Sequence, residues 1–501
     1  MSFGPATHTG NPISEGQSCR HSALMASFSR TASVSLQFII IGGGVAGLAS
    51  AFALRKAGHQ VLLLEKASGP AKEGCGFRSP PNMSRILERW GLGAELAQYA
   101  IKGSEISFRL AETGEKVGAM VFHEEIMKGF GADWLYLQYG DICEWLHDLA
   151  IEAGATIRYG CEVVSIDPYR VSATLSSGET IRADLMIGAD GLSSLVRRSV
   201  VGRTSLSSHN TSQLYITSGY VSADVIKRHH ILRDLLYGPE MPMWMGDRYT
   251  IYGHAIHGYQ AYSVTIAAPL RRPYRPSGKG QVPELDVDRD SLEPRLRLLL
   301  DLMTISDVAT PPSQEPLESL VHDSGKVILI GSAANLIPPC QTQDAATGIE
   351  DAATLGNLFS RLRSSEQIPS LISAYEEIRQ PRLAEVLPSE LRKQQQVTLP
   401  ADSDARVIRD NGLRAVLAQA VLDWEQADEE LLRSQWEEYI RMFNYDADEV
   451  ADDWWIKWGK LMDVEQQNRH EESMRLQAGL SAAQMQISVS RVSDRRMGMR
   501  A

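Results

Sequence analysis

The chain has 501 residues, 43% of them hydrophobic and 22% charged, so it is long enough to bury a large core as two coupled domains or one lobed unit. Its formal net charge of −12 argues against nucleic-acid binding, because a phosphate backbone requires a basic protein face. Five scattered cysteines without a CxxC pair predict neither a disulfide framework nor a metal site, and they fit a reducing, cytoplasmic compartment.

Residues 1–35 are rich in Ser, Thr and Gly, and we expect a disordered extension there. A mitochondrial transit segment is the alternative, since Glu15 is the only acidic residue. Arg20 and Arg30 are the only arginines, however, and no apolar face is evident. An upstream start codon, with Met25 as the functional start, would account for the same composition.

The first strong pattern lies between residues 36 and 65. An apolar run at 36–41 ends at glycines, an Ala- and Leu-rich stretch follows, and a second apolar run occupies 61–65. This order predicts strand, turn, helix and strand, a βαβ unit on a parallel sheet. The apolar stretch 38–54 also invites a membrane interpretation, but its glycines favour the βαβ unit, so we expect no integral membrane segment.

Gly42, Gly44 and Gly47 form a G-x-G-x-x-G motif directly after the first predicted strand. Gly42 allows the tight turn, Gly44 lets a pyrophosphate approach the backbone, and Gly47 lets the helix pack on the strand. The helix N-terminus offers N–H groups and a favourable dipole to the anion. Glu65 ends the second strand, where a carboxylate can accept hydrogen bonds from ribose hydroxyls. The residues predicted here to bind a dinucleotide are Gly42, Gly44, Ala46, Gly47, Glu65 and Lys66.

Later segments extend this pattern. Apolar runs at 184–188 and 326–331 predict further strands of the same sheet. Residues 213–268 alternate apolar and polar positions, which predicts an antiparallel, half-buried sheet. After residue 355 the sequence becomes helical and acidic, and the end of the chain reads as a flexible tail.

From about residue 38 to residue 455 the sequence resembles the salicylate-hydroxylase-like and para-hydroxybenzoate-hydroxylase-like FAD-dependent monooxygenases. Segment 184–197 resembles the family's second motif, which serves both FAD and the passing nicotinamide nucleotide. Segment 328–356 resembles the third motif, which contacts the ribityl chain and the isoalloxazine ring. The resemblance implies FAD as cofactor and these further cofactor-binding residues: Arg78, Asp190, Gly191, Arg197, Gly331, Ser332, Pro339, Gln343, Asp344 and Ala345.

Several residues depart from the family pattern. Ser332 stands where the third motif has an aspartate, and Asp344 follows Gln343 where the family has a glycine. Near residue 140 the family has a flavin-contacting arginine, and this chain has Tyr139, while Arg78 stands where glutamine is frequent. We expect Asp344 either to repel an anionic reduced flavin or to cap the helix that begins there.

The resemblance implies that NAD(P)H reduces FAD, that O₂ then gives a flavin C4a-hydroperoxide, and that a small aromatic or cyclic substrate is hydroxylated. His254 falls where relatives often carry an aromatic residue on the substrate side of the flavin, so it is the candidate catalytic residue. A satisfied core histidine is the alternative. Two other functions stay open: a same-fold oxidase, dehydrogenase or epoxidase, and a redox-weakened relative that acts as a binding protein.

The expected fold is α/β, a glutathione-reductase-like FAD-binding fold with an antiparallel substrate sheet and a helical C-terminal region. The expected segments are a disordered extension (1–35), a discontinuous FAD-binding domain (36–105, 138–205 and 320–360), a substrate domain (106–137 and 206–319), a helical region (361–470) and a flexible tail (471–501).

Overall fold

The computed structural model describes residues 30–72, 74–202, 214–238, 240–272, 284–309, 317–338, 341–420 and 437–459. The predicted tail, Pro339 and most of the predicted N-terminal extension therefore lie outside the described residues. The chain divides into two compact units, residues 1–448 and 449–501, and every described sheet belongs to the first.

Five parallel strands form one sheet of the first unit, in the order β18-β12-β1-β2-β8. Most of their residues are apolar and buried, as a parallel sheet covered on both faces requires. The four predicted strands are confirmed, and they pair although they lie far apart in the sequence. The bounds are β1 Gln37–Ile41, β2 Gln60–Leu64, β8 Thr156–Arg158, β12 Leu185–Gly188 and β18 Val327–Leu329.

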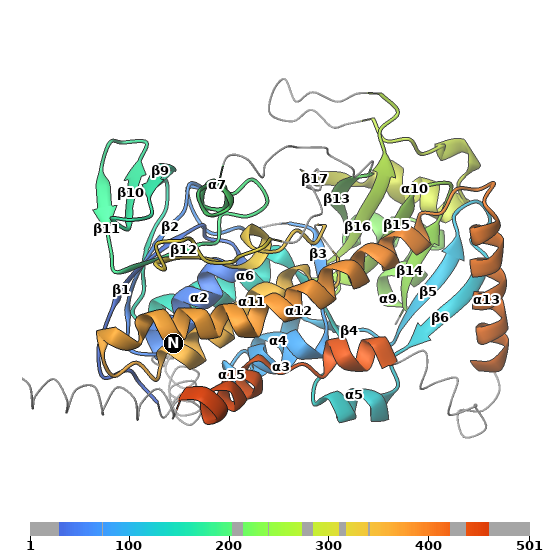
Figure 1. Ribbon diagram of the computed structural model, residues 1–501. Coiled ribbons are helices and arrows are strands. Elements are labelled where there is room, and N and C mark those ends of the chain that lie inside the picture. Colours follow the sequence, from blue (N-terminus) through green and yellow to red (C-terminus); the bar gives the residue numbers. More distant parts are fainter. Residues whose placement is uncertain are drawn as a thin grey trace, which may run out of the picture. The chain divides into compact units, whose positions relative to one another are not determined.

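Four long helices accompany this sheet, and α11 lies against α2 on one side and against α12 on another (Figure 1). The α2–α11 contact is close because it is made of small residues. A Cβ atom added to Gly348 would lie 2.8 Å from the Cβ of Ala46, and one added to Gly356 would lie 2.8 Å from the Cβ of Ala53. The bounds are α2 Val45–Lys56, α6 Tyr139–Glu152, α11 Asp344–Phe359 and α12 Ile368–Val397.

A seven-stranded sheet follows the order β17-β13-β16-β15-β14-β5-β6 and confirms the predicted antiparallel sheet, although β5 runs parallel to β14. The half-buried character is wrong for β15, whose residues are all buried. Strands β3 (Gly76–Ser79) and β7 (Leu135–Gln138) pack against the second face of this sheet. The bounds are β5 Glu105–Leu110, β6 Lys116–Val121, β13 Leu214–Ser222, β14 Glu240–Met245, β15 Thr250–Ile256, β16 Ala261–Pro269 and β17 Thr304–Ala309.

Smaller elements complete the two units. Two three-stranded sheets have the orders β3-β7-β4 and β11-β10-β9. Their strands are β3 Gly76–Ser79, β4 Ile101–Lys102, β7 Leu135–Gln138, β9 Val163–Asp167, β10 Ser172–Leu175 and β11 Thr180–Arg182. The remaining α-helices of the described residues are α3 Pro81–Arg89, α4 Gly93–Tyr99, α5 Glu124–Phe130, α7 Leu195–Val201, α8 Ala223–Arg228, α9 Arg233–Tyr237, α10 Pro294–Leu302, α13 Asp404–Ala420 and α15 Ala447–Trp454.

A fully buried ionic network joins α11 to α12. Arg379 donates to Glu350 at 2.9 Å and to Asp351 at 2.6 Å, and Arg382 donates to Glu350 at 3.0 Å. Asn82 of α3 donates a further hydrogen bond to Glu350 at 2.8 Å. Burial by itself raises the pKa of Glu350, but Arg382 and Arg379 outweigh it, and the pKa lies below its ordinary value. The network thus contains two carboxylates and two guanidiniums, so its negative and positive groups are equal in number.

We expect Arg379→Met to lower the free energy of unfolding by about 3–5 kcal/mol, because it leaves buried carboxylates without their cation. Chemical denaturation followed by circular dichroism measures the change. Arg158→Met is the matched control, since the Arg158–Glu179 ion pair lies at the surface, and its stability should stay close to wild type. Equal effects of the two substitutions would contradict a special role for the buried network.

Candidate dinucleotide and substrate sites

Two positions require glycine where β1 leads into α2, one in the turn and one in the first turn of the helix. Gly42 has φ +108°, and a Cβ atom there would lie 2.3 Å from the carbonyl oxygen of Ala189. A Cβ atom on Gly47 would lie 2.0 Å from the carbonyl oxygen of Gly42. Both glycines are therefore required by the packing of the turn, whatever it binds.

Gly44 differs, because its backbone is extended and the nearest atom to an added Cβ is the Tyr139 hydroxyl at 3.2 Å. Gly44 is the N-cap of α2; no side chain caps this helix, and its first turn has no acidic residue. The N-terminus of α2 therefore offers backbone N–H groups with no side chain at the N-cap, which fits the pyrophosphate of a dinucleotide. Ala46 of this turn packs against Gly331, so its place is fixed by the third motif.

Glu65 accepts hydrogen bonds from the backbone N–H groups of Gly43 at 2.6 Å and Ala67 at 2.7 Å. These bonds fix the carboxylate beside the glycine turn. A carboxylate has about four acceptor positions, so ribose hydroxyls can still bind to it. Its role as ribose ligand stays a prediction, as does that of Lys66, whose side chain is exposed.

The second motif is held by its own helix. Asp190 accepts hydrogen bonds from the N–H groups of Leu195 at 2.7 Å and Val196 at 3.2 Å, and from the Ser194 hydroxyl. It therefore caps the N-terminus of α7. Gly191, with φ +73°, follows directly and has open space where a side chain would lie.

Arg197 joins the second motif to the third. Its buried guanidinium donates to four carbonyl oxygens, those of Ser332 (2.6 Å), Ala333 (2.7 Å), Gly191 (3.1 Å) and Leu192 (3.1 Å). Burial lowers the pKa of Arg197, and Asp190 partly opposes this shift. The observed contacts of this cation are with the protein backbone, which the sequence did not indicate.

The polar groups of the third motif form two sets of contacts, one inside the core and one at the start of α11. Gly331, with φ +53°, donates its N–H to buried Asp351, and Gln343 accepts a hydrogen bond from Asn82 at 2.9 Å inside the core. The Ser332 hydroxyl instead donates to the carboxylate of Asp344 at 3.1 Å. Asp344 is the first residue of α11, and Ala345, partly exposed, is the second. The N-cap residue of α11 is Gln343, without a side-chain capping hydrogen bond, so the capping of α11 by Asp344 stays a prediction.

His254 lies on the face of the seven-stranded sheet that meets β3. A Cβ atom added to Gly76 of β3 would lie 2.5 Å from its ring. The ring is 2% exposed and stacks on Tyr136 with centroids 4.5 Å apart. Burial lowers the pKa of His254 to about 3, so the imidazole is neutral. Arg78 of β3 lies on the same face, with its guanidinium 4.7 Å from the ring centre of Tyr252.

His257 and Asp141 form a hydrogen-bonded contact that sequence reasoning missed. His257 lies in the turn just after β15, and its Nδ1 is 2.9 Å from both carboxylate oxygens of Asp141 in the first turn of α6. The ring also stacks on Tyr99, with centroids 5.3 Å apart. The contact joins the β15–β16 turn to the helix that begins with Tyr139. Residues 116 positions apart give no local sequence signal for it.

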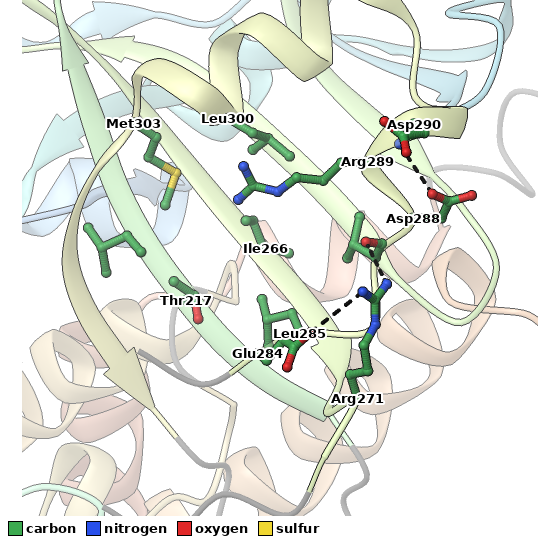
Figure 2. A pocket seen from close by; sticks show the side chains of 12 residues that line it. Thr217, Ile266, Arg271, Glu284, Leu285, Asp288, Arg289, Asp290, Leu300 and Met303 are labelled. Carbon is green, nitrogen blue, oxygen red and sulfur yellow. Dashed lines mark hydrogen bonds and ion pairs between the residues drawn. The ribbon is translucent and has the colours of Figure 1, made fainter. Parts of the chain in front are cut away.

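A cavity of about 440 Å³ lies on the opposite face of the seven-stranded sheet (Figure 2). Thr217 of β13 and Ile266 of β16 are paired, and both line this cavity. Ile266 is also paired with Ile251, so it is out of phase with Tyr252 and His254, whose side chains point to the other face. This cavity is therefore separate from the face that meets β3.

Within the described part of the chain no group of His, Cys, Asp or Glu side chains is arranged to hold a metal ion. The same residues include no helix that is both long enough and apolar enough to cross a membrane.

Comparisons with known proteins bear on this site. A family model described as an FAD binding domain matches residues 35–243, which include the glycine turn, Glu65 and the second motif. The chain is 26% identical to the FAD-dependent monooxygenase OpS4 of Beauveria bassiana (strain ARSEF 2860), over 83% of this chain and 96% of that protein. It is 28% identical to hispidin-3-hydroxylase of Neonothopanus nambi, over 74% of this chain and 90% of that protein.

Among solved structures, a salicylate hydroxylase substrate complex matches with a TM-score of 0.63 and 21% identity, over 83% of this chain and 97% of that one. At this identity the match shows the fold. The predicted α/β FAD-binding fold and the predicted resemblance to FAD-dependent aromatic hydroxylases are both confirmed.

The two kinds of glycine predict different mutant behaviour. Gly42→Ala should lower the free energy of unfolding by at least about 1–3 kcal/mol, because the residue adopts a left-handed conformation and meets the Ala189 carbonyl. Gly44→Ala should fold nearly as well as wild type but lose FAD, because its methyl group lies in the cradle. Thermal melting and FAD fluorescence titration measure the two effects. Full FAD affinity in Gly44→Ala would place the pyrophosphate elsewhere.

The neutral state of His254 predicts a pH-dependent stability. Its folded pKa of about 3 lies below the ordinary value of 6.5, so the unfolded chain binds an extra proton below pH 6.5 and stability falls as the pH falls. Between pH 7 and pH 5 this loss is roughly 2 kcal/mol. In His254→Asn the loss should be absent, and the slope of stability against pH should be correspondingly smaller. His230→Asn, at an exposed position, is the matched control; a wild-type slope in His254→Asn would contradict the assignment.

Proposed function

The chain is an FAD-binding oxidoreductase that resembles the FAD-dependent aromatic hydroxylases and monooxygenases, and on this premise we propose that it uses NAD(P)H and O₂ to hydroxylate a small aromatic or cyclic substrate. The observation that carries the proposal is the uncapped N-terminus of α2 behind a glycine turn. Residues 36–105, 138–205 and 320–360 would hold FAD, and residues 106–137 and 206–319 would hold the substrate. The cytoplasmic location stays a prediction.

Bound FAD would supply electron transfer from NAD(P)H and the activation of O₂. The chain's own residues would position the two ligands. Gly44 and the first N–H groups of α2 would hold the pyrophosphate, and Glu65 a ribose. The Arg197 contacts would keep the second and third motifs together beside it.

The face of the seven-stranded sheet that meets β3 would bind the substrate. Its described side chains combine the aromatic rings of Tyr252 and His254 with the guanidinium of Arg78. Aromatic surfaces suit a ring, and a buried cation favours a carboxylate or phenolate. We therefore propose a phenol or an aromatic acid as substrate. His254, being neutral, would contribute a hydrogen bond to it but no charge.

A redox-weakened relative is the second candidate, and Tyr139, Ser332 and Asp344 are the observation that favours it. None of the three is the residue that the family resemblance implies at its position. Such a protein would bind FAD, or FAD and a ring compound, without turnover. The same experiment separates the two functions.

We expect NAD(P)H oxidation to be slow alone and to accelerate when the substrate binds. A panel of phenols and aromatic acids under air, followed at 340 nm, identifies the substrate class. With labelled O₂, the product should contain one labelled oxygen atom; a dehydrogenase would introduce none. The FAD-deficient variant Gly44→Ala is the control and should oxidise no NAD(P)H. If the protein binds FAD and no compound accelerates oxidation, the weakened relative is the correct function.

A further inference from the structure

The cavity on the opposite face of the seven-stranded sheet lies outside both sites of the proposed function (Figure 2). Its volume of about 440 Å³ falls within the range of sites that hold small organic molecules, roughly 300–1,000 Å³. Buried aliphatic side chains form its inner wall: Ile266 of β16, Leu300 of α10, and Val287. A ligand that fills this part of the cavity must therefore present an apolar body.

One polar group interrupts the apolar inner wall. Thr217 of β13 lines the cavity and is 1% exposed, and its hydroxyl has no hydrogen-bond partner among the described residues. Because β13 is paired with β16 on one side and with β17 on the other, the backbone around Thr217 is used by the sheet. A buried hydroxyl without a partner costs free energy, so a ligand oxygen bonded to Thr217 would remove this cost.

The inner wall suits an organic ligand better than water. A buried water molecule usually makes about three hydrogen bonds. The side chains of the inner wall offer it one hydroxyl, that of Thr217. An organic molecule with a single oxygen atom would bond to the same hydroxyl and also cover the aliphatic side chains.

The exposed rim of the cavity bears on the charge of the ligand. It carries two guanidiniums and three carboxylates, those of Arg271, Arg289, Glu284, Asp288 and Asp290. Arg271 lies 3.6 Å from a carboxylate oxygen of Glu284 and 3.6 Å from one of Asp286. Arg289 donates to Asp301 at 3.1 Å. Both arginines thus already have carboxylate partners, and the rim offers no excess of positive charge to an anion.

We propose that this cavity is a second binding site, for a small neutral molecule with an apolar ring or chain and one hydroxyl or carbonyl oxygen that bonds to Thr217. The proposal goes beyond the proposed function and does not depend on it, because FAD and the substrate are assigned to other parts of the fold.

The test is titration of the full chain with menthol, a neutral ring alcohol, by isothermal titration calorimetry. We expect one molecule to bind per chain. Thr217→Val keeps the shape of the side chain and removes its hydroxyl, so it should bind menthol about 2- to 10-fold more weakly, as the loss of one neutral hydrogen bond predicts. Thr265→Val is the matched control, because buried Thr265 lies 3.3 Å from the Ser218 hydroxyl on the other face of the sheet, and its affinity for menthol should equal that of wild type.

Thermal melting of the same variants without ligand gives a second readout. Thr217→Val should raise the melting temperature, because it removes a buried hydroxyl that has no partner. Thr265→Val should lower it, because it removes the contact with Ser218. A lower melting temperature in Thr217→Val would mean that its hydroxyl already has a partner in the folded chain, and the inference would be overturned.

Two further measurements test the location and the charge. Met303, partly buried directly after α10, lines the cavity, so Met303→Trp should fill it and abolish menthol binding while circular dichroism stays unchanged. Octanoate, an anion with an apolar chain, should bind more weakly than menthol. The inference is wrong if menthol does not bind, if its affinity is unchanged in Thr217→Val or in Met303→Trp, or if octanoate binds more tightly.

Discussion

The buried ionic network between α11 and α12 is the interaction that positions the candidate dinucleotide site. Ionised groups lose hydration on burial, and a buried network is tolerable only when its charges balance and its hydrogen bonds are made. Glu350, Asp351, Arg379 and Arg382 meet both conditions. The directional bonds then fix how α11 and α12 align along their length, which apolar contacts alone would fix less well.

The third motif depends on this network directly. Asp351 accepts the N–H of Gly331, and Glu350 accepts from Asn82, which in turn donates to Gln343. One end of the loop between β18 and α11 is therefore tied to Asp351, and the other end is tied through Asn82 to Glu350. Gly331 also meets Ala46 of the first motif, and the backbone of Ser332 meets Arg197 of the second. One set of core charges thus sets the relative position of three motifs that lie far apart in the sequence.

The sequence predicted the parts of this arrangement that local pattern controls. Strand and helix periodicity identified the parallel sheet, and the spacing of Gly42 and Gly47 identified the turn, because steric demands within a few residues decide both. The contact partners of long polar side chains could not be predicted from the sequence. Arg197 contacts carbonyl groups 135 and 136 positions away, and Asn82 meets Glu350 at a separation of 268. Such contacts exist only once the sheet has brought its segments together, and the complete burial of β15 arises in the same way.

The departures from the family pattern occur in two pairs of positions, and in each pair a charged residue and an uncharged residue have changed places. The family has an aspartate at position 332 and a glycine at position 344; this chain has Ser332 and Asp344, and the two side chains touch. A carboxylate therefore remains at this point although its place in the sequence has moved by twelve residues. The family arginine and glutamine at positions 139 and 78 are Tyr139 and Arg78 here. This second exchange also moves the charge to another place in the fold, since Arg78 lies over Tyr252 on the sheet face that is proposed to bind the substrate. If FAD and the substrate bind as proposed, this chain has a positive charge beside the aromatic rings and none at position 139, which would lower the attraction for the cofactor's phosphates and raise it for an anionic ring compound.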